Sequence, residues 1–328
     1  MLLSTIVKSY RKVRVLCVGD VMLDHFLYGK VERISPEAPV PVFNFQSEKR
    51  MLGGAGNVVA NLHSLGCSAD LICFVGSDTA GEEVRRLLDA VCEHAMAVAV
   101  PGFPTIEKTR VIAGNNHLLR IDNERRFDCA ADTGDILGPE LDARVKAADI
   151  VLLSDYAKGM LSPERCRRII DACKKAGKPV IIDPKGDDYS KYAHATVVKP
   201  NLKEFNQATG MDCRPAEADF KEKLCRGARE LFERHGIENL LVTLSEHGMA
   251  FVSAKAPDAV FQIPTEAREV FDVSGAGDTS LAAFGASLAA GADIQDAMKL
   301  ANIASGVAVG KLGTSCVTDV EILDALFR

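Results

Sequence analysis

The chain has 328 residues, of which 47% are hydrophobic, and it carries a formal net charge of -6 at pH 7. This apolar content is ample for one large α/β domain or two ordinary ones. The two signs of charge are interspersed without a basic stripe, which argues against a nucleic-acid-binding protein. No apolar run has the length of a membrane-spanning helix, and the first residues do not form a secretion signal. We therefore expect a cytoplasmic protein that acts on small molecules and binds neither nucleic acid nor membrane.

Short, strongly apolar runs alternate with amphipathic stretches along the chain. The apolar runs are 13–18, 71–75, 150–153, 180–182, 197–198 and 240–244, and the clearest amphipathic stretches are 81–92, 163–175 and 216–235. This alternation predicts an α/β fold with a mostly parallel sheet covered by helices on both faces. The ten cysteines are scattered singly, without a CxxC pair or a Cys/His cluster, so we expect free thiols.

Two stretches depart from this alternation. Residues 31–46 and 105–122 alternate polar and apolar side chains, and the second contains the turn signal Asn115-Asn116. We expect these stretches to leave the main sheet and form a lid of β-strands that closes over a ligand. Because lid strands with free edges favour pairing, a homodimer through the lid is plausible.

The segment 270–280, VFDVSGAGDTS, carries the clearest chemical signal. Gly275, Ala276 and Gly277 precede a probable helix, and together with its first amides they would form an anion-binding turn. Asp278 stands where the turn becomes helix, so its carboxylate could accept a proton while the amides hold a transferring phosphoryl group. The alternative is that Asp278 only caps the helix.

Two further motifs suit a polar substrate. Asp24 follows the first strand and could accept hydrogen bonds from sugar hydroxyls, although a simple loop acid is an alternative. Gly53 and Gly54 open a helix and would let a ligand approach the backbone closely, while Asn57 could orient it.

Two more motifs follow strands and suit a nucleotide. Asn201 and Glu204 are three residues apart, a spacing that suits a hydrated Mg²⁺ beside phosphates but equally a helix capping box. The string TLSEHG supplies hydroxyl groups and a glycine at a strand end. Its candidate phosphate and ribose contacts are Thr243, Ser245, Glu246 and Gly248.

Taken together, these motifs resemble the ribokinase or PfkB family of carbohydrate kinases. The strings GGAGNVVANLHSLG and DVSGAGDTSLAAF resemble its two characteristic motifs, and KPNLKE and TLSEHG lie between them in the matching order. The resemblance covers essentially the whole chain. It implies a single ribokinase-like domain over residues 1–328, a three-layer α/β/α fold with a small β-strand lid, ATP as co-substrate, and Mg²⁺.

A narrower resemblance concerns the acceptor. The strings GDVMLDHFLYG, RISPEAPVPVF, TIEKTRVI, LSDYAKGML, IDPKGDDYSKY and VGKLGTS resemble bacterial kinases that phosphorylate D-glycero-β-D-manno-heptose 7-phosphate to the 1,7-bisphosphate for lipopolysaccharide precursors. The HxGH motif of the nucleotidyltransferase domain often fused to them is absent from this sequence, so we expect the stand-alone kinase form.

The resemblance implies a role for each matching residue. Asp278 matches the catalytic base, and Gly275, Ala276 and Gly277 match the anion hole. The remaining matches to the sugar site are Asp24, Gly53, Gly54 and Asn57; to the magnesium motif, Asn201 and Glu204; to the nucleotide site, Thr243, Ser245, Glu246, Gly248 and Asn302; and to a possible K⁺ site, Asp272, Ser274, Ala308, Lys311 and Gly313.

A 7-phosphate on the sugar would need cations. The candidates are Lys108, Arg110, Arg120, Lys158 and Lys185, the last on the nucleotide side, and each could instead be an ordinary surface cation. Asp155 could bind a sugar hydroxyl or hold Lys158. A PfkB-type kinase of another sugar or nucleoside and a catalytically silent member of the family are the alternatives to a heptose phosphate kinase.

Overall fold

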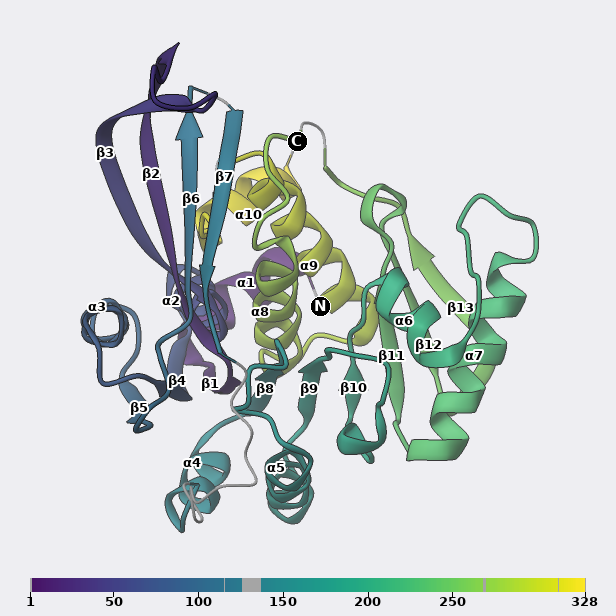
Figure 1. The fold of residues 1–328 in the computed structure, drawn as a ribbon. Helices are drawn as coiled ribbons and strands as arrows, with labels where there is room; N and C mark the ends of the chain where they lie inside the picture. Colours follow the sequence, from purple (N-terminus) through teal and green to yellow (C-terminus); the bar gives the residue numbers. More distant parts are fainter. Residues whose placement is uncertain (1, 115, 126–136, 268–269, 312, 328) are drawn as a thin grey trace.

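The computed structural model describes residues 2–114, 116–125, 137–267, 270–311 and 313–327. A nine-stranded sheet runs through the middle of this part of the chain (Figure 1). Its strands, in spatial order, are β13 (Ala256–Ile263), β12 (Met249–Ser253), β11 (Asn239–Thr243), β10 (Val197–Val198), β9 (Val180–Asp183), β8 (Ile150–Ser154), β1 (Arg14–Gly19), β4 (Ser68–Val75) and β5 (His94–Ala99). β12 pairs antiparallel with both of its neighbours, β11 and β13, and the other neighbouring strands pair parallel.

The predicted mostly parallel sheet is therefore confirmed, and each predicted apolar run lies within one of its strands or extends one residue beyond it. Alternate residues of β1 enter different cores: Val15 and Cys17 pack on one face of the sheet, and Leu16 and Val18 on the other. Because both faces are covered, the strands read as continuous apolar runs. The sequence signal did not reveal β5, β12 and β13, which have partly exposed residues and lie at the two sides of the sheet.

Helices cover both faces and complete the ribokinase-like three-layer arrangement. The core that contains Val15 takes side chains from α1 (Leu3–Ser9), α2 (Ala55–Ser64), α8 (Ala276–Ala289), α9 (Ile294–Val309) and α10 (Asp319–Leu326), and at its side from α3 (Thr79–Leu88). The opposite core takes α4 (Glu140–Ala147), α5 (Pro163–Ala176) and α7 (Phe220–His235), while α3 and α6 (Leu202–Thr209) lie toward the two sides of the sheet. Among the described residues, no helix combines the length and apolarity that crossing a bilayer requires.

The strand order reverses between β1 and β8. From β1 the chain continues to β4 and β5 on one side, and it later returns through β8 to β9, β10 and β11 on the other. Ligands of open α/β sheets bind at such a switch point, outside the carboxyl ends of the strands. Asp20 and Asp155 are the first residues after these two strands, so they lie at the switch point.

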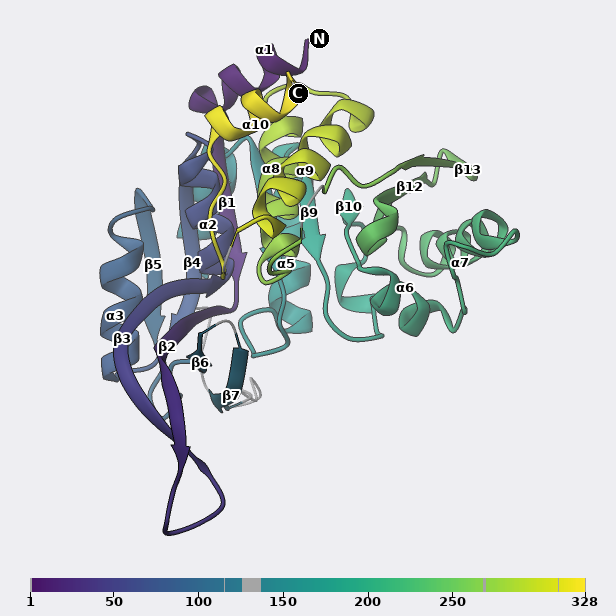
Figure 2. The ribbon, with the colours of Figure 1, turned by 90° about the horizontal axis from the view of Figure 1, so that it is seen from above.

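A second, four-stranded sheet forms the lid. Its strand order is β3 (Pro41–Gly54), β2 (Val21–Ile34), β6 (Glu107–Ala113) and β7 (Asn116–Asn123). The lid is present, but the predicted stretch 31–46 is shorter than the β2 and β3 strands, which together span 21–54. A single residue separates the end of β1 from the start of β2. The first half of β2 is so deeply buried that its polar and apolar residues do not alternate. Most of β3 is exposed, and the part beyond the predicted bound contains the charged run Glu48, Lys49 and Arg50, which hid it as well. Figure 2 shows the β2–β3 hairpin extending away from the body. Asn115 lies outside the described residues.

Candidate active site

Asp278 lies at the first turn of α8, buried beneath the lid. The helix is capped by Gly275, whose φ of +79° is one that glycine adopts readily, and Asp278 is its third residue with 3% of its surface exposed. Asn57 Nδ2 donates to Asp278 Oδ2 at 2.9 Å, and Tyr156 Oη donates to Oδ1 at 2.8 Å. The carboxylate therefore faces side chains and not the helix amides, so the alternative that it is the N-cap residue is wrong.

Burial changes the acidity of this carboxyl group. Desolvation raises the pKa of Asp278 to about 7, although the hydrogen bonds from Asn57 and Tyr156 act in the opposite direction by favouring the charged form. A general base works best when its pKa lies near the working pH. This raised pKa suits Asp278 to the role of a general base.

Asp20 holds the loop that carries Tyr156 through hydrogen bonds to the backbone of that loop. The Asp20 carboxylate accepts from the backbone amides of Tyr156 at 2.9 Å, Lys158 at 3.0 Å and Met160 at 2.9 Å. Burial and the nearby Asp155 raise the pKa of Asp20, while the three amides lower it. Asp20 thus spans the switch point and holds the loop against β1.

Asp155 pairs with residues other than Lys158, the partner that the sequence suggested. Its Oδ2 accepts from Tyr192 Oη at 2.7 Å and pairs with Lys191, and its Oδ1 accepts from the amide of Ala157 at 2.7 Å. Lys158 is not its partner. Because these partners already occupy the buried carboxylate, Asp155 acts on the loop and the expectation that it holds Lys158 is wrong.

The candidate sugar residues lie together between the lid and α2. Asp24 on β2 is 3% exposed and forms an ion pair with Arg110 of β6. A Cβ at Gly53 would stand 2.5 Å from Asp24 Oδ2, so only glycine leaves that carboxylate its place. Gly54 and Asn57 connect these residues to Asp278, since Gly54 precedes α2 and Asn57 donates to the Asp278 carboxylate.

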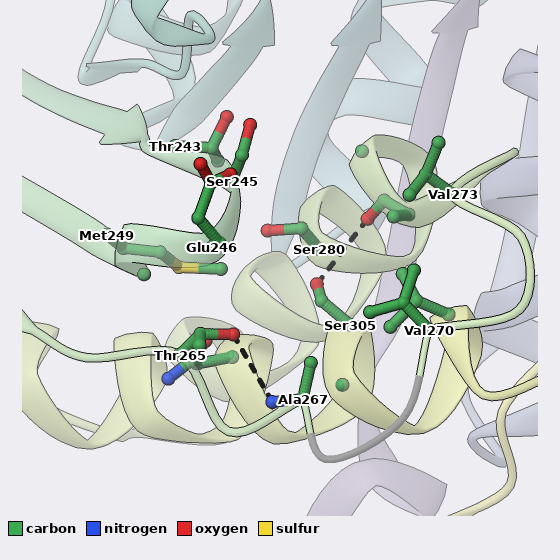
Figure 3. A pocket seen from close by; sticks show the side chains of 16 residues that line it. Thr243, Ser245, Glu246, Met249, Thr265, Ala267, Val270, Val273, Ser280 and Ser305 are labelled. Atoms are coloured by element: carbon green, nitrogen blue, oxygen red, sulfur yellow. Dashed lines mark hydrogen bonds between the residues drawn. The ribbon is translucent and has the colours of Figure 1, made fainter.

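A cavity of about 410 Å³ opens on the other side of α8. It contains all five residues of the predicted nucleotide set, namely Thr243, Ser245, Glu246, Gly248 and Asn302. Figure 3 shows the first three across the cavity from Val270 and Val273. The sequence did not single out its apolar lining, which is formed in part by Met249, Val270, Val273 and Val309. Apolar walls with polar groups at one side suit a nucleotide base and its ribose.

Asn302 shapes this cavity. Its Nδ2 donates to the carbonyl oxygen of Pro264 at 2.6 Å and so fixes the segment after β13 against α9. Gly306, one turn later, lets that segment approach, because a Cβ there would stand 3.1 Å from the amide of Ala267.

A second cavity of about 170 Å³ lies beside the first, and both share Thr243 and Gly277 as lining residues. Lys199 is 2% exposed and pairs with Asp183 at 3.0 Å, and Lys185 Nζ donates to Glu204 Oε1 at 2.8 Å. Burial raises the pKa of Asp183, which Lys199 partly opposes. Sequence reasoning missed Asp183, Lys199 and Tyr156, although all three lie at or just after the carboxyl ends of parallel strands and that position was the available signal.

Asn201 and Glu204 form the capping box that was one of the two readings of their spacing. The Glu204 amide donates to Asn201 Oδ1 at 2.9 Å, and the Asn201 amide donates to Glu204 Oε2 at 3.1 Å. Both residues also line the second cavity. The structure thus establishes the capping alternative and leaves the side chains at the edge of a polar cavity.

The candidate phosphate cations all meet carboxylates. Arg120 Nε donates to Asp122 at 2.8 Å, and Lys108 and Lys158 meet Glu124 at 3.2 and 2.7 Å. These pairs lie on the lid and on the loop below it.

The candidate K⁺ residues bring two chain segments together. Asp272 accepts from the amides of Ser274 at 2.9 Å and Gly313 at 3.0 Å. The Lys311 side chain points elsewhere, to Glu321 and the carbonyl oxygen of Cys316, and the Lys311 amide donates to the Ala308 carbonyl at 3.0 Å.

The first cavity, the buried carboxylate of Asp278 next to its lining residue Gly277, and the buried Asp24 on the lid together suit a phosphotransferase. The model of the pfkB family of carbohydrate kinases matches residues 12–319, so the chain belongs to this family and is a carbohydrate kinase that uses ATP.

Two curated relatives extend the similarity. Both are named bifunctional protein HldE. The one from Paramagnetospirillum magneticum is 46% identical over 99% of this chain, and the one from Caulobacter vibrioides is 44% identical over 98%. The chain spans 66% and 65% of their lengths, about two thirds.

Solved structures share the fold. An Arabidopsis thaliana ribokinase complexed with ribose and ATP matches with a TM-score of 0.74 at 20% identity, and phosphofructokinase-2 from Escherichia coli in complex with potassium with 0.76 at 21%. Both matches cover 96% of this chain and 99% of the other. At this identity the likeness concerns the fold alone.

Proposed function

We propose that this kinase transfers the γ-phosphoryl group of ATP to the anomeric hydroxyl of D-glycero-β-D-manno-heptose 7-phosphate and yields the 1,7-bisphosphate, a lipopolysaccharide precursor. The observation that carries the chemistry is the position of Asp278. Its carboxylate contacts Asn57 on the sugar side, and the adjacent Gly277 lines both cavities on the nucleotide side.

The reaction follows from this arrangement. Asp278 takes the proton of the anomeric hydroxyl, whose oxygen then attacks the γ-phosphorus as the bond to the β–γ bridging oxygen of ATP breaks and ADP leaves. The backbone amides of Gly275, Ala276 and Gly277 at the start of α8 are the groups that would stabilise negative charge on the transferring phosphoryl. Lys185 and Lys199 line the second cavity, which Gly277 also lines, and they add positive charge there.

The metal assignments are part of this proposal. Asn201 and Glu204 present oxygen atoms, which Mg²⁺ prefers, but both Glu204 oxygens already accept hydrogen bonds, so the pair suits an ion held through its waters. Mg²⁺ would neutralise charge on the ATP phosphates. A K⁺ ion would lie between segments 272–274 and 308–313, held through backbone carbonyls, since the Lys311 side chain is directed away.

The choice of acceptor rests on the strings RISPEAPVPVF and LSDYAKGML, and the identity to the HldE relatives supports it. A coupled assay of ADP release with a panel of acceptors tests it. We expect turnover with the heptose 7-phosphate and Mg²⁺ to exceed turnover with fructose 6-phosphate, ribose or a nucleoside. Faster turnover with any of these three would assign the chain to another substrate.

A further inference from the structure

Glu124 links the lid to the body through two lysines. Its Oε1 accepts from Lys158 Nζ at 2.7 Å, and its Oε2 accepts from Lys108 Nζ at 3.2 Å. Lys108 lies on β6 of the lid, whereas Lys158 lies on the loop after β8. One carboxylate therefore holds two cations that come from different parts of the fold.

This cluster lies on the face of the lid that carries Asp24. Lys108 lies opposite Asp24 in the backbone register of β2 and β6. Arg110, two residues further on, forms an ion pair with Asp24. Residues two apart in a strand share a face. Lys108 therefore lies on the same face of the lid as Asp24, and Glu124 joins Lys158 to it.

The other end of the cluster is fixed relative to the base. Asp20 holds the amides of Tyr156 and Lys158, and Tyr156 donates to Asp278. Lys158 therefore stands two residues from a side chain that contacts the base. A sugar with its anomeric hydroxyl at Asp278 would extend its far end toward this part of the lid.

We propose that Lys108 and Lys158 bind the distal phosphate of the acceptor sugar, and that Glu124 occupies this position until the phosphate displaces it. A phosphate monoester carries more negative charge than a carboxylate and has three terminal oxygens, so it can accept from both lysines at once. The side chains of Lys108, Lys158 and Glu124 are 15%, 23% and 27% exposed, so phosphate can reach them and Glu124 can turn to solvent.

The pairing with the lysines also changes the acidity of Glu124. The hydrogen bond from Lys158 has the largest effect and lowers the pKa of this carboxyl. Burial raises the pKa, and Lys108 lowers it again, so the net shift is downward. Glu124 is therefore charged at neutral pH and balances the lysines while the cleft is empty. A competing carboxylate at this position weakens phosphate binding, and its removal strengthens it.

The test replaces Glu124 by Gln and measures binding of inorganic phosphate by calorimetry, with the nucleotide site filled by Mg²⁺ and a non-hydrolysable ATP analogue. We expect Glu124→Gln to tighten phosphate binding about three- to tenfold, because it removes two partly exposed ion-pair contacts. Lys158→Met should weaken binding at least tenfold. Glu217→Gln, which alters a Glu–Lys pair with Lys223 elsewhere on the surface, should leave it unchanged. Unchanged or weaker binding in Glu124→Gln would overturn the proposal and make Glu124 a structural bridge.

This inference deepens the proposed function, and the two fail differently. If the wild type phosphorylates the heptose 7-phosphate but Glu124→Gln does not lower KM for it, the role of Glu124 is wrong and the proposed reaction stands. If Glu124→Gln tightens phosphate binding while the heptose 7-phosphate is not turned over, the site stands and the proposed acceptor is wrong. Equal melting temperatures of the Glu124→Gln variant and the wild type would show that the effect is local.

Discussion

The phenol of Tyr156 and the carboxylate of Asp278 share a hydrogen bond of 2.8 Å in which Tyr156 Oη is the donor. The two residues are separated by 122 positions in the sequence. Tyr156 is held by its own backbone amide on Asp20, so the direction of its hydroxyl is set by the switch point of the sheet. Together with Asn57 it fixes the orientation of the Asp278 carboxylate.

We expect Tyr156→Phe to shift the acidic limb of the kcat–pH profile upward by about one to two pH units. A hydrogen bond to a charged carboxylate contributes about 1.5–3 kcal/mol, and its loss raises the pKa of Asp278 above about 7. Activity at neutral pH should fall, while activity near pH 9 should approach that of the wild type. Steady-state rates over pH 5.5–9.5 measure this.

Tyr189→Phe is the matched control. Tyr189 is also buried, but its hydroxyl has no hydrogen-bond partner among the described residues. Its replacement should leave the pH profile in place. If Tyr156→Phe lowers kcat equally at every pH, Tyr156 contributes to packing and does not adjust the base.

Asp278→Asn should reduce kcat by roughly two to four orders of magnitude, since an amide cannot accept the proton. The substitution keeps the shape of the site: the Asn oxygen can accept from Asn57, and its NH₂ group can donate to the Tyr156 hydroxyl. ATP binding, measured by calorimetry, should be preserved. Turnover near the wild-type rate would show that another group removes the proton.

The raised pKa of Asp278 also predicts how stability depends on pH. Between roughly pH 4 and 7 the folded protein binds a proton at Asp278 that the unfolded chain releases, so the free energy of unfolding falls as pH rises through this window. The rise from 3.8 to about 7 corresponds to roughly 4 kcal/mol at most. Burial raises the pKa of Asp20 and Asp183 too, which acts in the same direction.

Melting curves of the wild type and Asp278→Asn at pH 5 and pH 8 measure this effect. We expect the variant to be the more stable protein at pH 8 and to lose most of that advantage at pH 5, where Asp278 is already neutral. Equal differences at both values would mean that Asp278 does not ionise within this range in the folded protein.

The sequence predicted the segment around Asp278 more fully than the residues that hold its neighbours in place. The turn and the helix around Asp278 are local, so the start of α8 and the glycine turn could be predicted from eleven consecutive residues. Asp20 and Tyr156 could not be paired in this way, because their contact depends on β1 lying beside β8, which only the folded sheet establishes. The lid bounds failed for a related reason: burial of β2 by the body removes the alternation that marks a half-exposed strand.

Gly275→Ala tests the contact between the glycine turn and the sugar side. A Cβ at this position would stand 2.7 Å from Asn57 Nδ2, the atom that donates to Asp278, and the φ of +79° strains any other residue. We expect a loss of about 1–3 kcal/mol in the free energy of unfolding and a lower kcat.

Gly291→Ala separates these two causes. Gly291 has a φ of +89°, but no atom stands within 4 Å of the position its Cβ would take. Denaturant unfolding should show a similar backbone penalty in both variants, whereas only Gly275→Ala should impair turnover. If both variants keep wild-type kcat, Asn57 tolerates the added methyl group.

The outer face of the lid predicts a homodimer. Arg120 and Asp122 lie on the charged face, so the alternating residues Leu119 and Ile121 lie on the other, where they are 56% and 52% exposed. We expect a dimer at micromolar concentration that forms through this face. A double substitution of Leu119 and Ile121 to Asp should weaken dimer affinity at least tenfold, since burial of each apolar side chain contributes about 1–2 kcal/mol. Sedimentation velocity measures the change. Val320→Asp, at an exposed position of α10, should leave the mass unaltered. A wild-type protein that sediments as a monomer would exclude this interface.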